Sequence, residues 1–145
     1  EMLLSIRICD LGLRRADSTL KARIDRVHFE PTQKGLAFQP RSDLTTEWLC
    51  PDRVLWIGIP FSLAHSRLRD LEKSQIREIE GDTEHDCMKL LRHEAGHAIN
   101  YAHRLCQKSR WRELFCPISE EYNVRDYFPR KDSRALVVHL PENYA

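Results

Sequence analysis

The sequence lacks an excess of charge of either sign, and it lacks long apolar runs. Of its 145 residues, 23 are Lys or Arg and 22 are Asp or Glu. This balance gives no support to nucleic acid or an acidic membrane surface as a partner. No apolar stretch approaches the roughly 20 residues that a membrane-spanning helix requires, and no repeat or low-complexity segment is present. We therefore expect no nucleic acid and no membrane among the partners.

Paired cysteines are also lacking. The five cysteines are scattered along the chain, and no two of them form a C-x-x-C pair. The sequence therefore contains neither a zinc knuckle nor a dithiol redox motif. Unpaired thiols are typical of a reducing compartment, so we expect the protein to be cytoplasmic. The length of 145 residues suits one domain with a buried core, and we expect a single domain over residues 1–145.

What the sequence does contain is an HExxH motif, the pentapeptide from His93 to His97. On an α-helix, residues four apart lie on one face, about 6 Å from each other. The imidazoles of His93 and His97 can therefore reach the same metal ion. Glu94 lies beside them, in position to take a proton from a metal-bound water. The motif predicts a Zn2+ site in which His93 and His97 are metal ligands and Glu94 is the catalytic general base.

The residues around the motif predict a helix. Thr83, with Asp86 three residues later, is a suitable N-cap for a helix that begins near Glu84. Apolar residues then recur at helical spacing, at Met88, Leu91, Ala95, Ala98, Ala102 and Leu105. The two histidines of the motif flank this stripe, so we expect them to face a cleft at the edge of the core. Gly96 costs such a helix about 1 kcal/mol relative to Ala, which indicates close approach of another backbone or of substrate.

The remaining patterns predict an α+β fold with a small mixed sheet. Alternating or β-branched residues predict strands over residues 4–8, 36–39, 45–49 and 54–59. The last of these is either a core strand or an edge that binds an extended peptide. Helical spacing predicts helices before the motif helix over residues 17–34, capped by Asp17 or Ser18, and 63–79. The tail 116–145 has weak periodicity, with one short helix or strand expected over 134–140.

A catalytic zinc ion usually has three protein ligands, and the motif supplies two. His103 would complete the HExxHxxGxxH spacing of the metzincins, but Asn100 replaces the central Gly. If the helix continues, His103 is rotated about 120° from the face that carries His97. Metzincins also need a methionine turn downstream, whereas both methionines, Met2 and Met88, lie upstream. A surface histidine is therefore the better interpretation of His103.

A glutamate from a second helix is the other common third ligand. The downstream candidates within the chain are Glu113, Glu120, Glu121 and Glu142. Glu113 follows the motif so soon that folding back would be tight, and Glu120 and Glu121 lie in a polar, loop-like segment. None of the four has the pattern of a second helix around it. Each is better explained as a solvated surface carboxylate.

The run from Cys87 to Ala102, which contains the motif, resembles a bacterial family of zinc-binding metallopeptidases. The resemblance extends to the segments Arg7–Leu13, Ile59–His65, Trp111–Phe115 and His139–Ala145. It therefore covers nearly the whole chain, and it is most specific at the HExxH motif.

This resemblance implies a zincin-like fold, a Zn2+ cofactor and a peptide or protein substrate. In the family, the segment that follows Ala145 continues into an acidic helix that supplies a Glu as the third ligand, as in gluzincins. The resemblance thus implies that the domain is incomplete at its C-terminus and that the third ligand lies beyond Ala145. The family position that matches His103 is often not histidine, which also argues against His103 as a ligand.

Together these features predict a zinc-dependent metallopeptidase that hydrolyses peptide bonds through a zinc-activated water, with Glu94 as general base. An oxyanion donor is expected among the tyrosines, which the sequence does not rank: Tyr101, Tyr122, Tyr127 and Tyr144. The alternative is a non-catalytic zincin-like module that serves as a binding or scaffold domain. Glu94 argues against this alternative, because metal binding alone does not require it.

Overall fold

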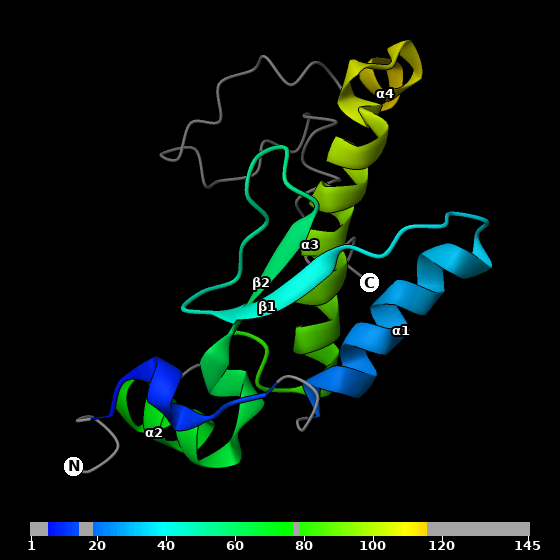
Figure 1. The fold of residues 1–145 in the computed structure, drawn as a ribbon. Helices are drawn as coiled ribbons and strands as arrows, with labels where there is room; N and C mark the ends of the chain where they lie inside the picture. Colours follow the sequence, from blue (N-terminus) through cyan, green and yellow to red (C-terminus); the bar gives the residue numbers. More distant parts are fainter. Residues whose placement is uncertain (1–5, 15–18, 77–78, 116–145) are drawn as a thin grey trace, which may run out of the picture.

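The computed structural model describes residues 6–14, 19–76 and 79–115 (Figure 1). Its helices are α1 (Leu20–Gln33), α2 (Ser66–Ile76), α3 (Glu84–His103) and α4 (Ser109–Phe115), with the 3-10 helices η2 (Ile8–Leu11), η4 (Phe61–Ala64) and η5 (Leu105–Gln107). Its strands are β1 (Arg41–Thr45) and β2 (Trp56–Pro60). This mixture of helices with a small two-stranded sheet is the α+β arrangement that the sequence predicts. No helix in these ranges is long and apolar enough to span a membrane.

The two strands run parallel, in the register Arg41↔Trp56 to Thr45↔Pro60. The connection 46–55 carries the chain past β2, because Leu49 forms an antiparallel bridge with Gly58. The Gly58 N–H donates to the Leu49 carbonyl at 2.7 Å, and the Leu49 N–H donates to the Gly58 carbonyl at 3.3 Å. A Cβ at position 58 would lie 2.7 Å from Leu49 Cδ2, so only glycine fits without a shift of this neighbour. The connection thereby covers the edge of β2 away from β1.

The strand expected over 54–59 corresponds to β2, which begins and ends slightly later, at Trp56 and Pro60. It is a core strand, since Ile57 is 1% exposed and Ile59 is 0% exposed. The alternative role, an edge that binds an extended peptide, is wrong for the part of β2 where Leu49 already occupies the edge.

The strands expected over 36–39 and 45–49 are wrong. Leu36 donates its N–H to the Pro31 carbonyl at 3.0 Å, which extends the turn at the end of α1 into this segment. After β1, the Thr45 hydroxyl donates to the Glu47 carbonyl at 2.7 Å and turns the chain away from the strand direction. Both errors arise from local hydrogen bonds that compete with sheet pairing.

Two further expectations near chain turns differ from the structure. The strand expected over 4–8 is wrong for residues 6–8, because Ile8 begins η2 and the Arg7 side chain pairs with Asp10 at 2.7 Å. The single helix expected over 63–79 is divided into η4 and α2. The division lies at His65, whose Nδ1 accepts a hydrogen bond from the Arg67 N–H at 3.2 Å and so caps α2.

Helix α1 is confirmed from Leu20 onward. Thr19 occupies its N-cap position, whereas Asp17 and Ser18 lie outside the described residues, as does the segment expected over 134–140. The core lies where α1 and the sheet pack against α3 (Figure 1). Its buried residues are Leu20, Ile24, Val27, Ile57, Ile59, Leu63, Ile79, Cys87, Met88, Leu91 and Ala95.

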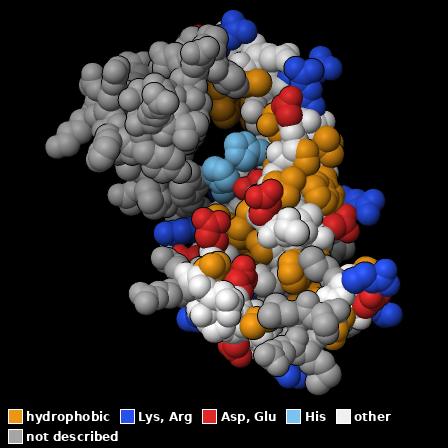
Figure 2. Space-filling view, turned by 90° about the vertical axis from the view of Figure 1, so that its left-hand side faces the viewer, with side chains coloured by type: hydrophobic (Ala, Val, Ile, Leu, Met, Phe, Trp, Pro, Cys, Tyr) orange, Lys and Arg blue, Asp and Glu red, His pale blue; other side chains and the backbone are white. Residues whose placement is uncertain are grey.

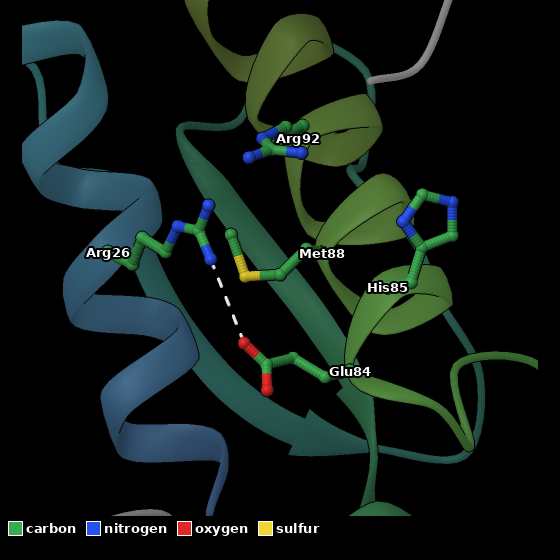
Figure 3. Close-up of a pocket in the computed structure, with 5 residues that line it drawn as sticks. All are labelled: Arg26, Glu84, His85, Met88 and Arg92. Carbon is green, nitrogen blue, oxygen red and sulfur yellow. Dashed lines mark ion pairs between the residues drawn. The ribbon is translucent and has the colours of Figure 1, made fainter. Parts of the chain in front are cut away.

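A pair of ionic contacts joins α1 to α3 beside this core. Arg92 donates from two guanidinium nitrogens to the two carboxylate oxygens of Glu30, both at 2.9 Å. Arg26 pairs with Glu84 at 3.7 Å, as Figure 3 shows. Between these contacts lies an open cavity of about 310 Å³, lined by Arg26, Glu84, His85, Met88 and Arg92. The bidentate Arg92–Glu30 ion pair links α1 to α3 immediately before the HExxH motif.

Candidate metal site

Helix α3 carries the whole motif on continuous helical backbone. At its start, the Thr83 hydroxyl oxygen accepts a hydrogen bond from the Asp86 N–H at 3.1 Å, which confirms the predicted N-cap. The helix then runs without a break to His103 and ends where Arg104 adopts a left-handed conformation with φ of 49°. The motif therefore lies in the middle of a regular helix, where side chains four residues apart share a face.

The two histidines of the motif point toward the same place. Nε2 of His93 lies 3.0 Å from Nε2 of His97, and the ring planes meet at 86°. A tetrahedral zinc ion bound about 2 Å from each of two nitrogens holds those nitrogens about 3.3 Å apart. The observed separation is close to that value, and imidazole is a ligand that zinc prefers. The geometry of this pair and its donor type therefore fit a shared zinc ion.

The histidines lie on the accessible side of α3, with His93 half-buried and His97 exposed. Figure 2 shows a face of the molecule on which histidine side chains gather beside acidic and hydrophobic ones. The cavity between α1 and α3 is a different feature, since none of the residues that line it belongs to the motif.

Glu94, the residue after His93, is turned toward the interior beside the two histidines. Only 7% of it is exposed, and burial raises the pKa of its carboxyl to about 7. The thiol of Cys50 lies near enough to be affected by it: burial first, and the Glu94 carboxylate second, raise the pKa of Cys50 to about 11. Glu94 therefore lies between α3 and the connection 46–55, next to the ligand pair.

The apolar stripe of α3 is shorter than the sequence predicts. Cys87, Met88, Leu91, Ala95 and Ala98 are buried, but Ala102 is exposed and Leu105 is half-buried. The prediction for Ala102 is wrong because the core ends below this level: neither strand of the sheet nor α1 contributes a buried core residue against the last turn of α3.

Tyr101 lies one helical turn beyond His97. Their rings are nearly parallel, with an angle of 22° and a centroid distance of 6.5 Å. Burial raises the pKa of Tyr101, and the nearby carboxylate of Asp52 raises it further. The other candidate oxyanion donors, Tyr122, Tyr127 and Tyr144, lie outside the described residues.

The described residues bring no third ligand to the histidine pair: in 6–14, 19–76 and 79–115, no three His, Cys, Asp or Glu side chains are grouped as a metal site. Asn100 does not end the helix, so His103 stays off the face that carries His97. The centroid of the His103 ring instead lies 6.3 Å from the centroid of the Phe38 ring.

The glutamate candidates for the third ligand fall into two groups. Glu113 is on α4, where it pairs with Arg110 at 3.0 Å and remains exposed. The other candidates lie outside the described residues, namely Glu120, Glu121 and Glu142. The solvated-carboxylate interpretation is therefore confirmed for Glu113.

Gly96 lies on the open side of the helix. No atom of a described residue, beyond its own helix backbone and chain neighbours, would come within 4 Å of a Cβ at this position. The expected close approach of another backbone is therefore wrong within the described part of the chain, and close approach of substrate stays a prediction.

Two residues near the site were missed by the sequence reasoning, Asp52 and Cys50. Both belong to the connection 46–55, which is remote from α3 in the sequence and is held on the fold by long-range contacts such as the bridge between Leu49 and Gly58 and the Trp48–Glu80 hydrogen bond. No local pattern could have indicated this contact. The placement of Tyr101 on His97, in contrast, follows from their spacing of four residues on one helix.

Comparisons with protein-family models, with curated proteins and with solved structures found no match to this chain.

Proposed function

We propose that this protein is a zinc-dependent metallopeptidase, with His93 and His97 as zinc ligands and Glu94 as the general base. The observation that carries the proposal is the convergence of the two Nε2 atoms, 3.0 Å apart, on a helix that buries the intervening glutamate. Burying a carboxylate is costly, and a general base beside a metal site gives this burial a purpose.

The chemistry expected of the site divides between the metal and the protein. A bound zinc ion would lower the pKa of a water ligand toward neutrality and polarise the scissile carbonyl. His93 and His97 bind through Nε2 as neutral imidazoles. Glu94 accepts the proton of the attacking water and delivers it to the leaving amine. Because Glu94 is shielded from bulk solvent, that proton is retained near the reacting atoms.

The proposal includes the finer features that the resemblance implies. These are a zincin-like fold, a peptide or protein substrate and a third ligand from a downstream acidic helix, as in gluzincins. A cytoplasmic location is also proposed, and it is supported by the free thiols among the described residues, which are Cys9, Cys50, Cys87 and Cys106.

Zinc titration by calorimetry tests the ligand pair. We expect the metal-free chain to bind zinc weakly, because the described residues group only two ligands, and we expect His97→Ala to abolish this binding. The variant Glu94→Gln should bind zinc as the original chain does, since Glu94 is not a ligand in the proposal. Equal binding by the chain and His97→Ala would overturn the assignment.

Hydrolysis is tested in a version extended by about 30 native residues, which is long enough for one further helix and its connection. We expect tighter zinc binding in this version and cleavage of a fluorogenic peptide library, with Glu94→Gln inactive. Tight, His97-dependent zinc without any cleavage would instead favour the non-catalytic binding or scaffold module.

A further inference from the structure

Three aromatic rings follow one another along the accessible face of α3, each one turn after the last. The His93 and His97 rings meet edge to face, with centroids 4.6 Å apart. The Tyr101 ring lies on the far side of His97, nearly parallel to it at 6.5 Å. Both separations are within the range of attractive ring pairs. The exposed His97 ring is therefore flanked by one aromatic ring on each side along the helix.

The outermost ring of this row lies near another part of the molecule. The Asp52 carboxylate, in the connection 46–55, is close enough to Tyr101 to raise the pKa of its hydroxyl. That connection is itself anchored on the sheet, because Leu49 and Gly58 exchange backbone hydrogen bonds of 2.7 and 3.3 Å. Within it, the Cys50 thiol donates to the Val54 carbonyl at 3.6 Å. The Tyr101 ring thus lies between His97 on its own helix and an anchored connection outside α3.

We propose that Tyr101 is a positioning residue of the metal site, which orients the His97 imidazole by ring packing. This inference rests on the proposed function, since it concerns a ligand of the proposed zinc ion. An exposed imidazole otherwise samples several rotamers, and binding a metal requires it to adopt one of them. Partners that orient a metal-binding histidine commonly change the affinity for metal by 10- to 100-fold.

The proposal assigns separate roles to the Tyr101 ring and its hydroxyl. The ring lies beside His97, so Tyr101→Leu removes the orienting group. Tyr101→Phe keeps the ring and loses only the hydroxyl. We therefore expect a loss of metal affinity in Tyr101→Leu and an affinity close to that of the original chain in Tyr101→Phe.

The test is a titration of the metal-free chain with Co2+, a spectroscopic substitute for zinc, followed by visible absorption. The matched control is Phe29→Leu, which removes a ring that is 59% exposed on α1, away from the motif. We expect Tyr101→Leu to weaken Co2+ binding about tenfold and to alter the absorption of the bound ion. Tyr101→Phe should retain the original spectrum, and Phe29→Leu should match the original chain in affinity and spectrum.

The possible outcomes separate this inference from the proposed function. If the original chain binds Co2+ in a His97-dependent manner and Tyr101→Leu binds it equally well with the same spectrum, the positioning role is wrong while the metal site stands. If the original chain and His97→Ala bind alike, the proposed function fails and the inference fails with it. If circular dichroism shows that Tyr101→Leu does not fold, Tyr101→Met, which is long and flexible but has no ring, decides: reduced affinity supports the positioning role, and unchanged affinity overturns it.

Discussion

The two halves of α3 are held in different ways. In the first half, from Glu84 to Arg92, the N-cap at Thr83, the buried stripe and the Arg92–Glu30 contact fix the helix to its surroundings. In the second half, from His93 to His103, the side chains of His97 and His103 are exposed, and the buried apolar residues are only the small Ala95 and Ala98. The difference indicates that the first half supplies stability and leaves the second half accessible for binding.

This division has a physical reason. Side chains that bind a metal or substrate must remain accessible, and accessible side chains bury little apolar surface. The second half therefore gains little stability of its own and depends on the continuous backbone that links it to the first half. Glu94 is the one charged residue buried in this half, beside the small Ala95 and Ala98. Substitutions in the first half should change stability, and substitutions in the second half should change metal binding.

The largest expected effect is the loss of a core contact in the first half. Leu91→Ala should lower the free energy of unfolding by about 2–5 kcal/mol, because Leu91 is 1% exposed and its removal leaves a cavity. Urea unfolding followed by circular dichroism measures this. Leu90→Ala is the matched control, because Leu90 is only half-buried and should cost clearly less. Equal losses in the two variants would contradict the packing described for α3.

The next effect concerns the contact between α1 and α3. The Arg92 guanidinium lowers the pKa of Glu30, mainly through its hydrogen bonds. A carboxylate with a lowered pKa contributes stability above its ordinary pKa of 4.5 and loses that contribution as pH falls through the lowered value. Glu30→Gln should therefore cost about 1.5 kcal/mol at pH 7 and progressively less below pH about 4.

The control for this pH dependence is Asp25→Asn on the same helix. Asp25 pairs with Lys21, and both side chains are 58% exposed, so the pair should contribute little at any pH. Urea unfolding at a series of pH values compares the two variants. A cost of Glu30→Gln that stays constant down to pH about 3 would show that the contact with Arg92 does not depend on ionised Glu30.

A smaller effect is expected at the start of α3. Thr83→Ala removes the hydroxyl that accepts the Asp86 N–H, which should cost about 1 kcal/mol. Thr19→Ala is the matched control, because Thr19 holds the same position at the start of α1 and makes no capping hydrogen bond through its side chain. Thermal unfolding should show a lower midpoint for Thr83→Ala alone. A similar decrease in both variants would indicate a general effect of threonine removal.

The sequence predicted the features of α3 that depend on neighbouring residues. The cap at Thr83, the start at Glu84 and the approach of His93 to His97 all follow from spacing within one or two turns of one helix. The end of β1 and the start of α2 were predicted less well, because single side-chain hydrogen bonds help to decide them. The Thr45 hydroxyl bonds just after β1 and the His65 imidazole bonds at the start of α2, and no periodicity reveals such bonds.

The surroundings of the site were beyond prediction for a different reason. The proximity of Cys50 to Glu94 and of Asp52 to Tyr101 depends on the connection 46–55, which the Leu49–Gly58 bridge and the Trp48–Glu80 hydrogen bond hold in place. Such long-range contacts are not encoded in any local pattern. The assignment of the two histidines as zinc ligands and of Glu94 as general base stays a prediction that the titrations above test.

The smallest expected effect is at Gly96, in the accessible half. Gly96 is helical, and a Cβ there would have no atom of a described residue within 4 Å beyond its own helix backbone and chain neighbours. Gly96→Ala should therefore stabilise the protein, by about 0.5–1 kcal/mol. The same substitution at Gly58 should destabilise it, since a Cβ there would clash with Leu49 at 2.7 Å. If Gly96→Ala gains stability and keeps its zinc affinity but reduces cleavage in the extended version, glycine at this position is retained for the approach of substrate. If cleavage is unchanged, Gly96 has no such role, and the openness of this face serves the histidines alone.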